Sequence, residues 1–105
     1  MTSSGDRVAP LPDGHKAVRL RIEGRVQGVS YRMWTVDEAT ARGLTGWVRN
    51  RRDGWVEALV VGEIVEVDAL IEACHRGPAL ARVTVVIVEP AQGIVADDFR
   101  EMPTV

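Results

Sequence analysis

The chain has 105 residues, a formal net charge of −2 and 46% hydrophobic residues, values typical of one globular domain with a modest core. A single cysteine, Cys74, excludes an internal disulfide and a cysteine-based zinc site, and no apolar run is long enough to span a membrane. The amino terminus also lacks the apolar core of a secretory signal, so we expect a cytoplasmic protein without a membrane partner.

Charge is distributed unevenly along the chain. Residues 16–52 carry nine Lys and Arg against three Asp and Glu, whereas residues 53–105 carry three Arg against ten acids. The positive half could create a local field that attracts an anion. Alternatively, folding could interleave the two halves and cancel the asymmetry.

The first fifteen residues contain Ser, Pro and Gly with little apolar periodicity, so they predict a disordered tail before one domain over 16–105. The domain starts with Lys16–Glu23, where apolar and charged residues alternate as in a half-buried strand. After a glycine-containing loop, Tyr31–Arg42 is predicted to be a helix, with Ser30 as its N-cap and Gly43 at its end. Its expected core-facing stripe consists of Tyr31, Thr35 and Ala39, with Trp34 beside them.

Two further strands are predicted at Leu44–Arg51 and Trp55–Val61, joined by a turn at Asp53-Gly54, a strong hairpin signal. Another strand is expected over about Ala81–Glu89, and a short last strand over Phe99–Met102.

A second helix is predicted over about Glu63–Arg76. Cys74 falls on its apolar face and is therefore expected to be a buried apolar group rather than a nucleophile. We place His75 and Arg76 in the last turn, where positive charge suits the helix dipole. The apolar face comprises Val67, Leu70, Ile71 and Cys74.

This order of elements predicts an α+β fold, a ferredoxin-like βαββαβ sandwich with two helices on one face of an antiparallel sheet of four to five strands. The third strand would lie between the first and second, which then run in the same direction. The glycine-containing loop leaves the end of the first strand, and Asn50 lies at the end of the second. We therefore expect Asn50 to lie near that loop.

The stretch Gly24–Arg32 resembles a site for phosphate. Glycines can turn several N–H groups toward one point, and the start of a helix adds unpaired donors. Arg32 would add a forked, permanently charged donor. The alternative is an ordinary strand-to-helix turn with an arginine on the surface.

The residues near this stretch restrict the reaction. No cysteine, histidine or aspartate adjoins the loop as a nucleophile, the nucleoside-triphosphate loop pattern is absent, and no clustered carboxylates and histidines suggest a metal. Asn50 could hold a water molecule. Such a site suits a phosphate with a good leaving group, and a carboxylate with a pKa of about 4 is one. An acyl phosphate fits this description.

Two motifs resemble the signatures of the acylphosphatase family. Gly24-Arg-Val-Gln-Gly-Val-Ser-Tyr-Arg32 is similar to G-x-V-Q-G-V-x-[FY]-R, and Gly46-Trp-Val-Arg-Asn50 with Asp53-Gly54 is similar to G-[FYW]-[AV]-x-N followed by D-G. A third similar stretch is Gly77-Pro78 followed by Ala81-Arg82-Val83. The resemblance covers about residues 16–102.

The resemblance implies a ferredoxin-like fold and cofactor-free, metal-independent hydrolysis of acyl phosphates to a carboxylate and inorganic phosphate. It assigns phosphate binding to Arg32 and orientation of the attacking water to Asn50. Arg51 departs from the Ser or Thr that members often carry there; the run of arginines could strengthen anion binding or be a solvated strand end. The resemblance places the phosphate-binding loop at Arg25, Val26, Gln27, Gly28, Val29, Ser30, Tyr31 and Arg32.

The expected partners are a small acyl phosphate and inorganic phosphate, with no nucleic acid, and the protein is expected to be a monomer. One alternative is a non-catalytic ferredoxin-like module that binds an anion or RNA, but aromatic residues are only 5% and the RNA-binding strand pattern is absent. Another is a domain resembling the acylphosphatase part of carbamoyl-transfer maturation enzymes.

Overall fold

Seven elements follow one another in the predicted order. The structure, a computed structural model, describes residues 10–93 and 96–105. The elements are β1 (His15–Arg25), α1 (Tyr31–Ala41), β2 (Thr45–Asn50), β3 (Val56–Glu63), α2 (Ile64–Cys74), β4 (Arg82–Pro90) and β5 (Phe99–Glu101). None of the helices in this described part is long and apolar enough to cross a bilayer.

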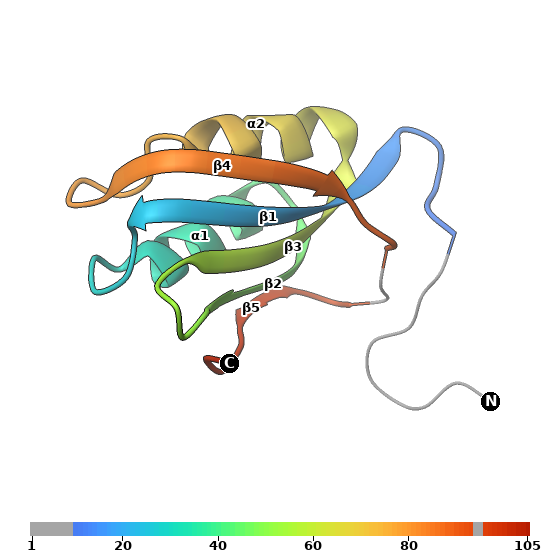
Figure 1. Ribbon diagram of the computed structural model, residues 1–105. Helices are drawn as coiled ribbons and strands as arrows, with labels where there is room; N and C mark the ends of the chain where they lie inside the picture. Colours follow the sequence, from blue (N-terminus) through green and yellow to red (C-terminus); the bar gives the residue numbers. More distant parts are fainter. Residues whose placement is uncertain (1–9, 94–95) are drawn as a thin grey trace.

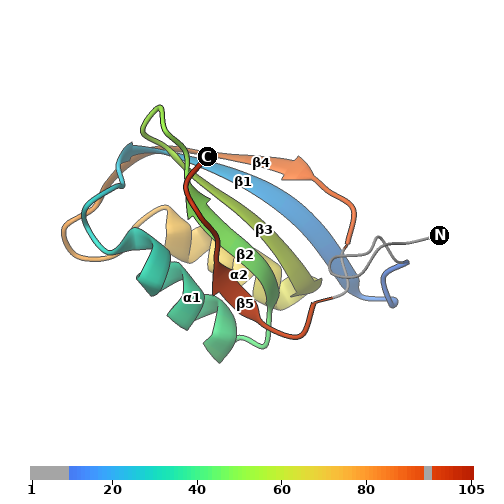
Figure 2. The ribbon, with the colours of Figure 1, turned by 90° about the horizontal axis from the view of Figure 1, so that it is seen from below.

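The strands form one five-stranded sheet in the order β4-β1-β3-β2-β5, and both helices cover the same face (Figures 1 and 2). The ferredoxin-like α+β prediction is thus confirmed, including the position of β3 between β1 and β2. Each of these two strands is antiparallel to β3, so β1 and β2 point the same way. The carboxyl ends of β1 and β2 therefore lie at the same end of the sheet.

The sheet is mixed, however, and not wholly antiparallel as predicted. β5 pairs in parallel with β2, with Gly46 opposite Phe99 and Val48 opposite Glu101. The reason is topological. After β4 at one edge, the chain crosses one end of the sheet to the other edge, and such a return reverses its direction relative to β4 (Figure 1).

Alternation along β1 separates the core from the open face of the sheet. Val18, Leu20 and Ile22 are buried against the helices, each contributing about 1.5–3 kcal/mol relative to an exposed position. The predicted stripe of α1 is confirmed, because Tyr31, Thr35 and Ala39 are all buried. On α2 the buried residues are Val67, Leu70, Ala73 and Cys74, with Ile71 partly buried.

The open face of the sheet carries many of the arginines of the positive half of the sequence. Glu57, which is nearly buried, lies 2.8 Å from Arg49, 3.4 Å from Arg51 and 3.8 Å from Arg19. Arg21 stacks on the Trp55 ring at 4.1 Å. Folding therefore places one acid of the negative half, Glu57, among three of these bases, and part of the charge asymmetry along the chain is offset on this face.

The first strand begins earlier than predicted, which shortens the expected tail. His15 pairs with Glu63 as the first residue of β1, and Leu11 packs against a small cluster on the open face. Residues 10–15 thus belong to the folded domain. The remainder of the predicted tail, residues 1–9, lies outside the described residues.

Ser30 is the N-cap residue of α1, as predicted, but its side chain does not cap the helix, and the end of α2 differs from the prediction. Ser30 has left-handed backbone angles, φ 64° and ψ 25°, and its side chain makes no capping hydrogen bond within the described residues. A side-chain N-cap requires extended backbone angles, which the turn at this loop does not provide. α2 ends at Cys74, so His75 is its C-cap and Arg76 lies beyond it rather than in the last turn.

Candidate active site

The loop between β1 and α1 owes its shape to one of the two glycines of the motif. Gly28 has φ +73° and open space where a side chain would be, so its role is conformational. Gly24 instead lies within β1, at a bulge opposite β4, where a Cβ atom would come 2.1 Å from the Arg82 carbonyl oxygen. Gly24 is therefore required for strand packing and not for the loop.

The loop and the start of α1 present unpaired backbone donors. The first backbone hydrogen bond of the helix runs from the Trp34 N–H to the Ser30 carbonyl oxygen. No acceptor in residues 10–93 or 96–105 bonds the backbone N–H groups of residues 28–33. Consecutive free N–H groups at a helix amino terminus, where the helix dipole is positive, favour an anion.

These donors border a pocket of about 360 Å³ at the end of the sheet where the β1–α1 and β2–β3 loops lie (Figure 2). Arg32 enters it from α1 and Asn50 from the end of β2, as the strand directions predict. The chain thus brings together two side chains eighteen positions apart. The complete lining is Val26, Gln27, Gly28, Ser30, Tyr31, Arg32, Met33, Asn50 and Glu101.

Two residues of the predicted phosphate-binding loop do not belong to this described lining. Arg25 is the last residue of β1, exposed and paired with Arg82 of β4. Val29 is buried in the core. The longer strand explains the first case, and the inward turn of the loop explains the second.

Arg32 contacts another side chain of the pocket, whereas Asn50 does not. The Arg32 Nε lies 3.6 Å from an Oε1 of Glu101, and both side chains are partly exposed, 37% and 45%. Among the described residues, none forms a hydrogen bond with the side-chain amide of Asn50. The guanidinium end of Arg32 and the amide of Asn50 can therefore both bind a ligand in the pocket.

Gln27 connects the loop to the hairpin that follows Asn50. Its Nε2 donates hydrogen bonds to the backbone carbonyl oxygens of Arg51, at 2.8 Å, and Trp55, at 2.9 Å. The Arg51 N–H bonds the same Trp55 carbonyl. The side chain of Gln27 thus holds the two halves of the pocket in register, a role that its position in the motif alone did not reveal.

Gln27→Met is expected to lower the free energy of unfolding by about 1–3 kcal/mol, because two hydrogen bonds worth about 0.5–1.5 kcal/mol each are lost while side-chain length is kept and both carbonyls retain one backbone donor. Urea denaturation measures this change. Gln92→Met, at an exposed glutamine away from the pocket, is the matched control and should leave stability nearly unchanged. Equal midpoints for the two variants would contradict the role given to Gln27.

Tyr31 anchors the start of α1 in the core. Its hydroxyl donates a 2.6 Å hydrogen bond to the Cys74 carbonyl oxygen, and its ring lies 5.3 Å from that of Trp34. Burial raises the pKa of the Cys74 thiol to about 12, and burial likewise raises the pKa of the Tyr31 phenol. Both groups stay protonated at neutral pH, which supports a structural role for each. The prediction that Cys74 is a buried apolar group is confirmed, because its side chain has no exposed surface.

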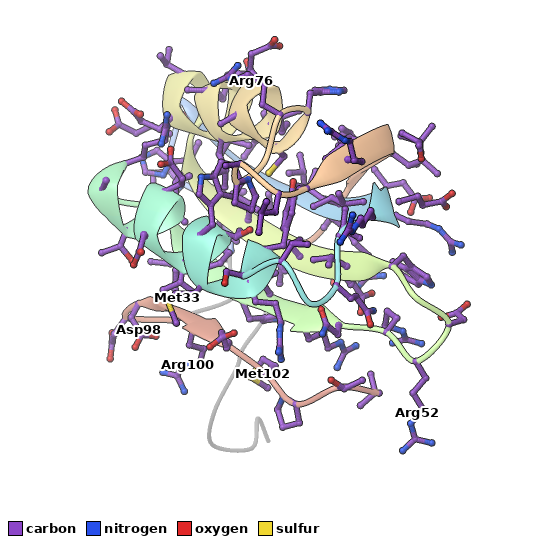
Figure 3. All side chains as sticks on the ribbon, turned by 90° about the vertical axis from the view of Figure 1, so that its left-hand side faces the viewer. Met33, Arg52, Arg76, Asp98, Arg100 and Met102 are labelled. Carbon is purple, nitrogen blue, oxygen red and sulfur yellow. The ribbon has the colours of Figure 1, made fainter. Side chains whose placement is uncertain are left out.

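Two residues of the pocket were not predicted from the sequence, Met33 and Glu101. Met33 is 62% exposed on α1, an unusual position for a large apolar side chain, and Figure 3 shows it on the side of α1 that faces β5. Glu101 reaches the pocket because β5 pairs with β2. Its partner in β2 is Val48, which lies two residues before Asn50. The sequence predicted the short strand β5, but it did not predict that β5 would pair with β2.

The arginines beside Asn50 point elsewhere. Arg49 and Arg51 bind Glu57 on the open face, and Arg51 also lies over the Trp55 ring at 5.4 Å. Arg52 extends from the tip of the β2–β3 loop (Figure 3). Arg51, which stands where family members often have Ser or Thr, thus forms a half-buried ion pair with Glu57. It is neither a solvated strand end nor part of the described pocket lining.

The described part of the chain offers no cluster of metal-binding side chains. Across the described ranges, no three His, Cys, Asp or Glu residues gather in a way that could hold a metal ion. The pocket contains one carboxylate, that of Glu101.

Comparisons with known proteins agree with this geometry. The structure of an acylphosphatase from Coxiella burnetii matches with a TM-score of 0.82 at 32% identity, covering 85% of this chain and 94% of that chain. A full-length HypF structure, described as phosphate- and nucleotide-bound, matches with a TM-score of 0.79 at 26% identity, but the match covers only 12% of that chain. The likeness to HypF therefore concerns one part of a much longer protein.

Sequence comparison is equally direct. An acylphosphatase of Rhizobium etli is 55% identical over 82 residues, which cover 78% of this chain and 87% of that relative. The acylphosphatase family model matches residues 18–100, nearly all of the folded domain. The chain therefore belongs to the acylphosphatase family, hydrolases that convert acyl phosphates to a carboxylate and phosphate.

Proposed function

We propose that hydrolysis takes place in the pocket shared by Arg32 and Asn50, by direct in-line attack of water on phosphorus without a metal ion. The observation that carries this proposal is the meeting of Arg32, Asn50 and the free N–H groups of the loop at one cavity. Phosphoryl transfer depends mainly on positioning and charge stabilisation, which these groups can provide.

In this mechanism the backbone N–H groups of the loop and the Arg32 guanidinium bind the three non-bridging oxygens of the phosphoryl group. The distribution of negative charge over these oxygens changes as the transition state forms. Donors that already point at the oxygens stabilise the new charge distribution without rearranging. The left-handed backbone of Gly28 and Ser30 supports this arrangement, because it reorients successive N–H groups within a short loop.

Asn50 orients the water, accepting a hydrogen bond from it through the side-chain oxygen. The water oxygen forms a new bond to phosphorus as the bond from phosphorus to the acyl oxygen breaks, and the carboxylate leaves with the electron pair. The proton of the water passes to a phosphate oxygen of the substrate. This assignment is supported by the state of Tyr31, whose buried phenol lines the pocket but stays protonated at neutral pH and donates its proton to the Cys74 carbonyl oxygen, so it is not available as a base.

The partners that we propose are a small acyl phosphate and inorganic phosphate, with the protein acting as a monomer in the cytoplasm and without nucleic acid. The contacts of Arg19, Arg49 and Arg51 with Glu57 support the last point, because this carboxylate offsets part of the positive charge on the open face. A salt-sensitive RNA complex would contradict it.

The proposal is tested with purified protein and benzoyl phosphate, whose loss is followed by ultraviolet absorbance with and without EDTA. We expect hydrolysis at the same rate in both conditions. A rate that falls in EDTA and returns with a divalent cation would overturn the metal-independent mechanism, and absence of hydrolysis in both would overturn the assignment of the reaction to this pocket.

A further inference from the structure

The described pocket lining contains one carboxylate beside the cation of Arg32. Glu101 on β5 lines the pocket, with its carboxylate 3.6 Å from the Arg32 Nε and its side chain 45% exposed. The phosphate contacts proposed above involve the loop and the guanidinium, and neither requires a carboxylate. An anionic substrate must therefore bind beside a like charge, for which the proposed mechanism gives no reason.

The volume of the pocket limits how far a bound group can be from that charge. A cavity of about 360 Å³, treated as a sphere, is about 9 Å across, which is comparable with the ~10 Å over which charges interact at 0.1 M salt. Any charged substituent on the acyl group that enters the pocket will interact with Glu101. The described pocket lining outside the phosphate contacts also includes Met33, an exposed thioether that offers an adaptable apolar surface.

We propose that Glu101 is a specificity-determining residue that disfavours acyl phosphates with an anionic acyl group, so that the preferred substrates carry uncharged or cationic acyl groups. The inference rests on the proposed function, since it assumes that phosphate binds at Arg32 and the loop. Repulsion by Glu101 has two parts. Its effect on the phosphoryl group is common to all substrates, whereas its effect on the acyl group depends on acyl charge.

Two substrates of equal chain length separate these parts. Butyryl phosphate ends in a methyl group and succinyl phosphate ends in a carboxylate, so the ratio of their kcat/KM values cancels whatever is common to both. Acyl phosphate remaining is measured as its hydroxamate, with spontaneous breakdown subtracted. For the unmodified protein we expect a preference for butyryl phosphate that weakens as ionic strength rises, because salt screens exposed charges.

Glu101→Gln removes the charge and keeps the size of the side chain. We expect the preference for butyryl phosphate to fall by about three- to tenfold, the range given by Coulomb's law for unit charges about 6 Å apart in a largely solvated site. Glu101→Lys should shift the ratio further in the same direction. Asp98→Asn is the matched control, because Asp98 precedes β5, pairs with Arg100 and lies outside the described pocket lining; the ratio should stay unchanged.

The outcomes are distinguishable. A fall in the ratio for Glu101→Gln but not for Asp98→Asn supports the inference. Equal changes in kcat/KM for both substrates would restrict Glu101 to its contact with Arg32 and overturn the inference alone, as would a salt-independent ratio in the unmodified protein. Failure of the unmodified protein to hydrolyse either substrate would overturn the proposed function, and the inference with it.

Discussion

Arg32→Ala is expected to lower kcat/KM for benzoyl phosphate by about a thousandfold or more. The guanidinium enters the pocket from the first turn of α1, and it is the cation of the described pocket lining. Removing it leaves the developing negative charge of the phosphoryl oxygens to the backbone N–H groups alone, and arginines that contact a transferring phosphoryl group contribute on this scale. The inhibition constant of inorganic phosphate should rise as well.

Steady-state kinetics and phosphate inhibition measure both effects, and circular dichroism verifies that the variant is folded. The side chain of Arg32 is partly exposed, so its removal should leave the core intact. Arg76→Ala is the matched control, since Arg76 is an exposed arginine just after α2 (Figure 3) and should be dispensable. Near-normal turnover in a folded Arg32→Ala variant would exclude this residue as the phosphate ligand.

Asn50→Ala is expected to have a different signature, with kcat about a hundredfold lower and phosphate binding nearly unchanged. The amide lies at the end of β2 and lines the pocket, but in the proposed mechanism it contacts the attacking water rather than the phosphoryl group. Loss of an interaction made mainly in the transition state lowers kcat and kcat/KM together. Misplacement of a water molecule by about 1 Å can cost this much.

The two variants, Arg32→Ala and Asn50→Ala, are distinguished by comparing kcat with the inhibition constant of phosphate. Arg32→Ala should raise the inhibition constant of phosphate, whereas Asn50→Ala should lower kcat and leave that constant within about twofold. Gln92→Ala controls for removal of an exposed amide. An Asn50→Ala variant with unchanged kcat would remove Asn50 from the mechanism.

The sequence predicted the elements well where the local pattern was strong. Alternation in Lys16–Glu23 located β1, and the four-residue spacing of Tyr31, Thr35 and Ala39 identified the buried side of α1. Errors occurred at the ends of elements, where tertiary contacts decide. His15 extends β1 because Glu63 lies opposite it, and Ser30, although it is the N-cap residue, makes no side-chain cap because the turn of the loop sets its backbone angles.

The candidate site was predictable in part, because the argument from strand direction requires only the order of elements. That order predicts that Asn50 and the loop before Arg32 lie at the same end of the sheet, and the pocket contains both residues. It did not distinguish the roles of the two motif glycines, since Gly24 is required by the approach of β4, which is distant in the sequence.

By itself, the sequence determined the hydrophobic periods, the glycine motif and the order of the elements, since all three can be read from residue types along the chain. The tertiary structure alone decided the neighbour of β5 and the side-chain contacts that follow from it. The parallel pairing of β5 with β2 brings Glu101 beside Arg32, and the pairing of β2 with β3 places Glu57 among Arg49 and Arg51. Contacts between side chains depend on register and on strand neighbours, which follow from the packing of the whole chain rather than from any local stretch.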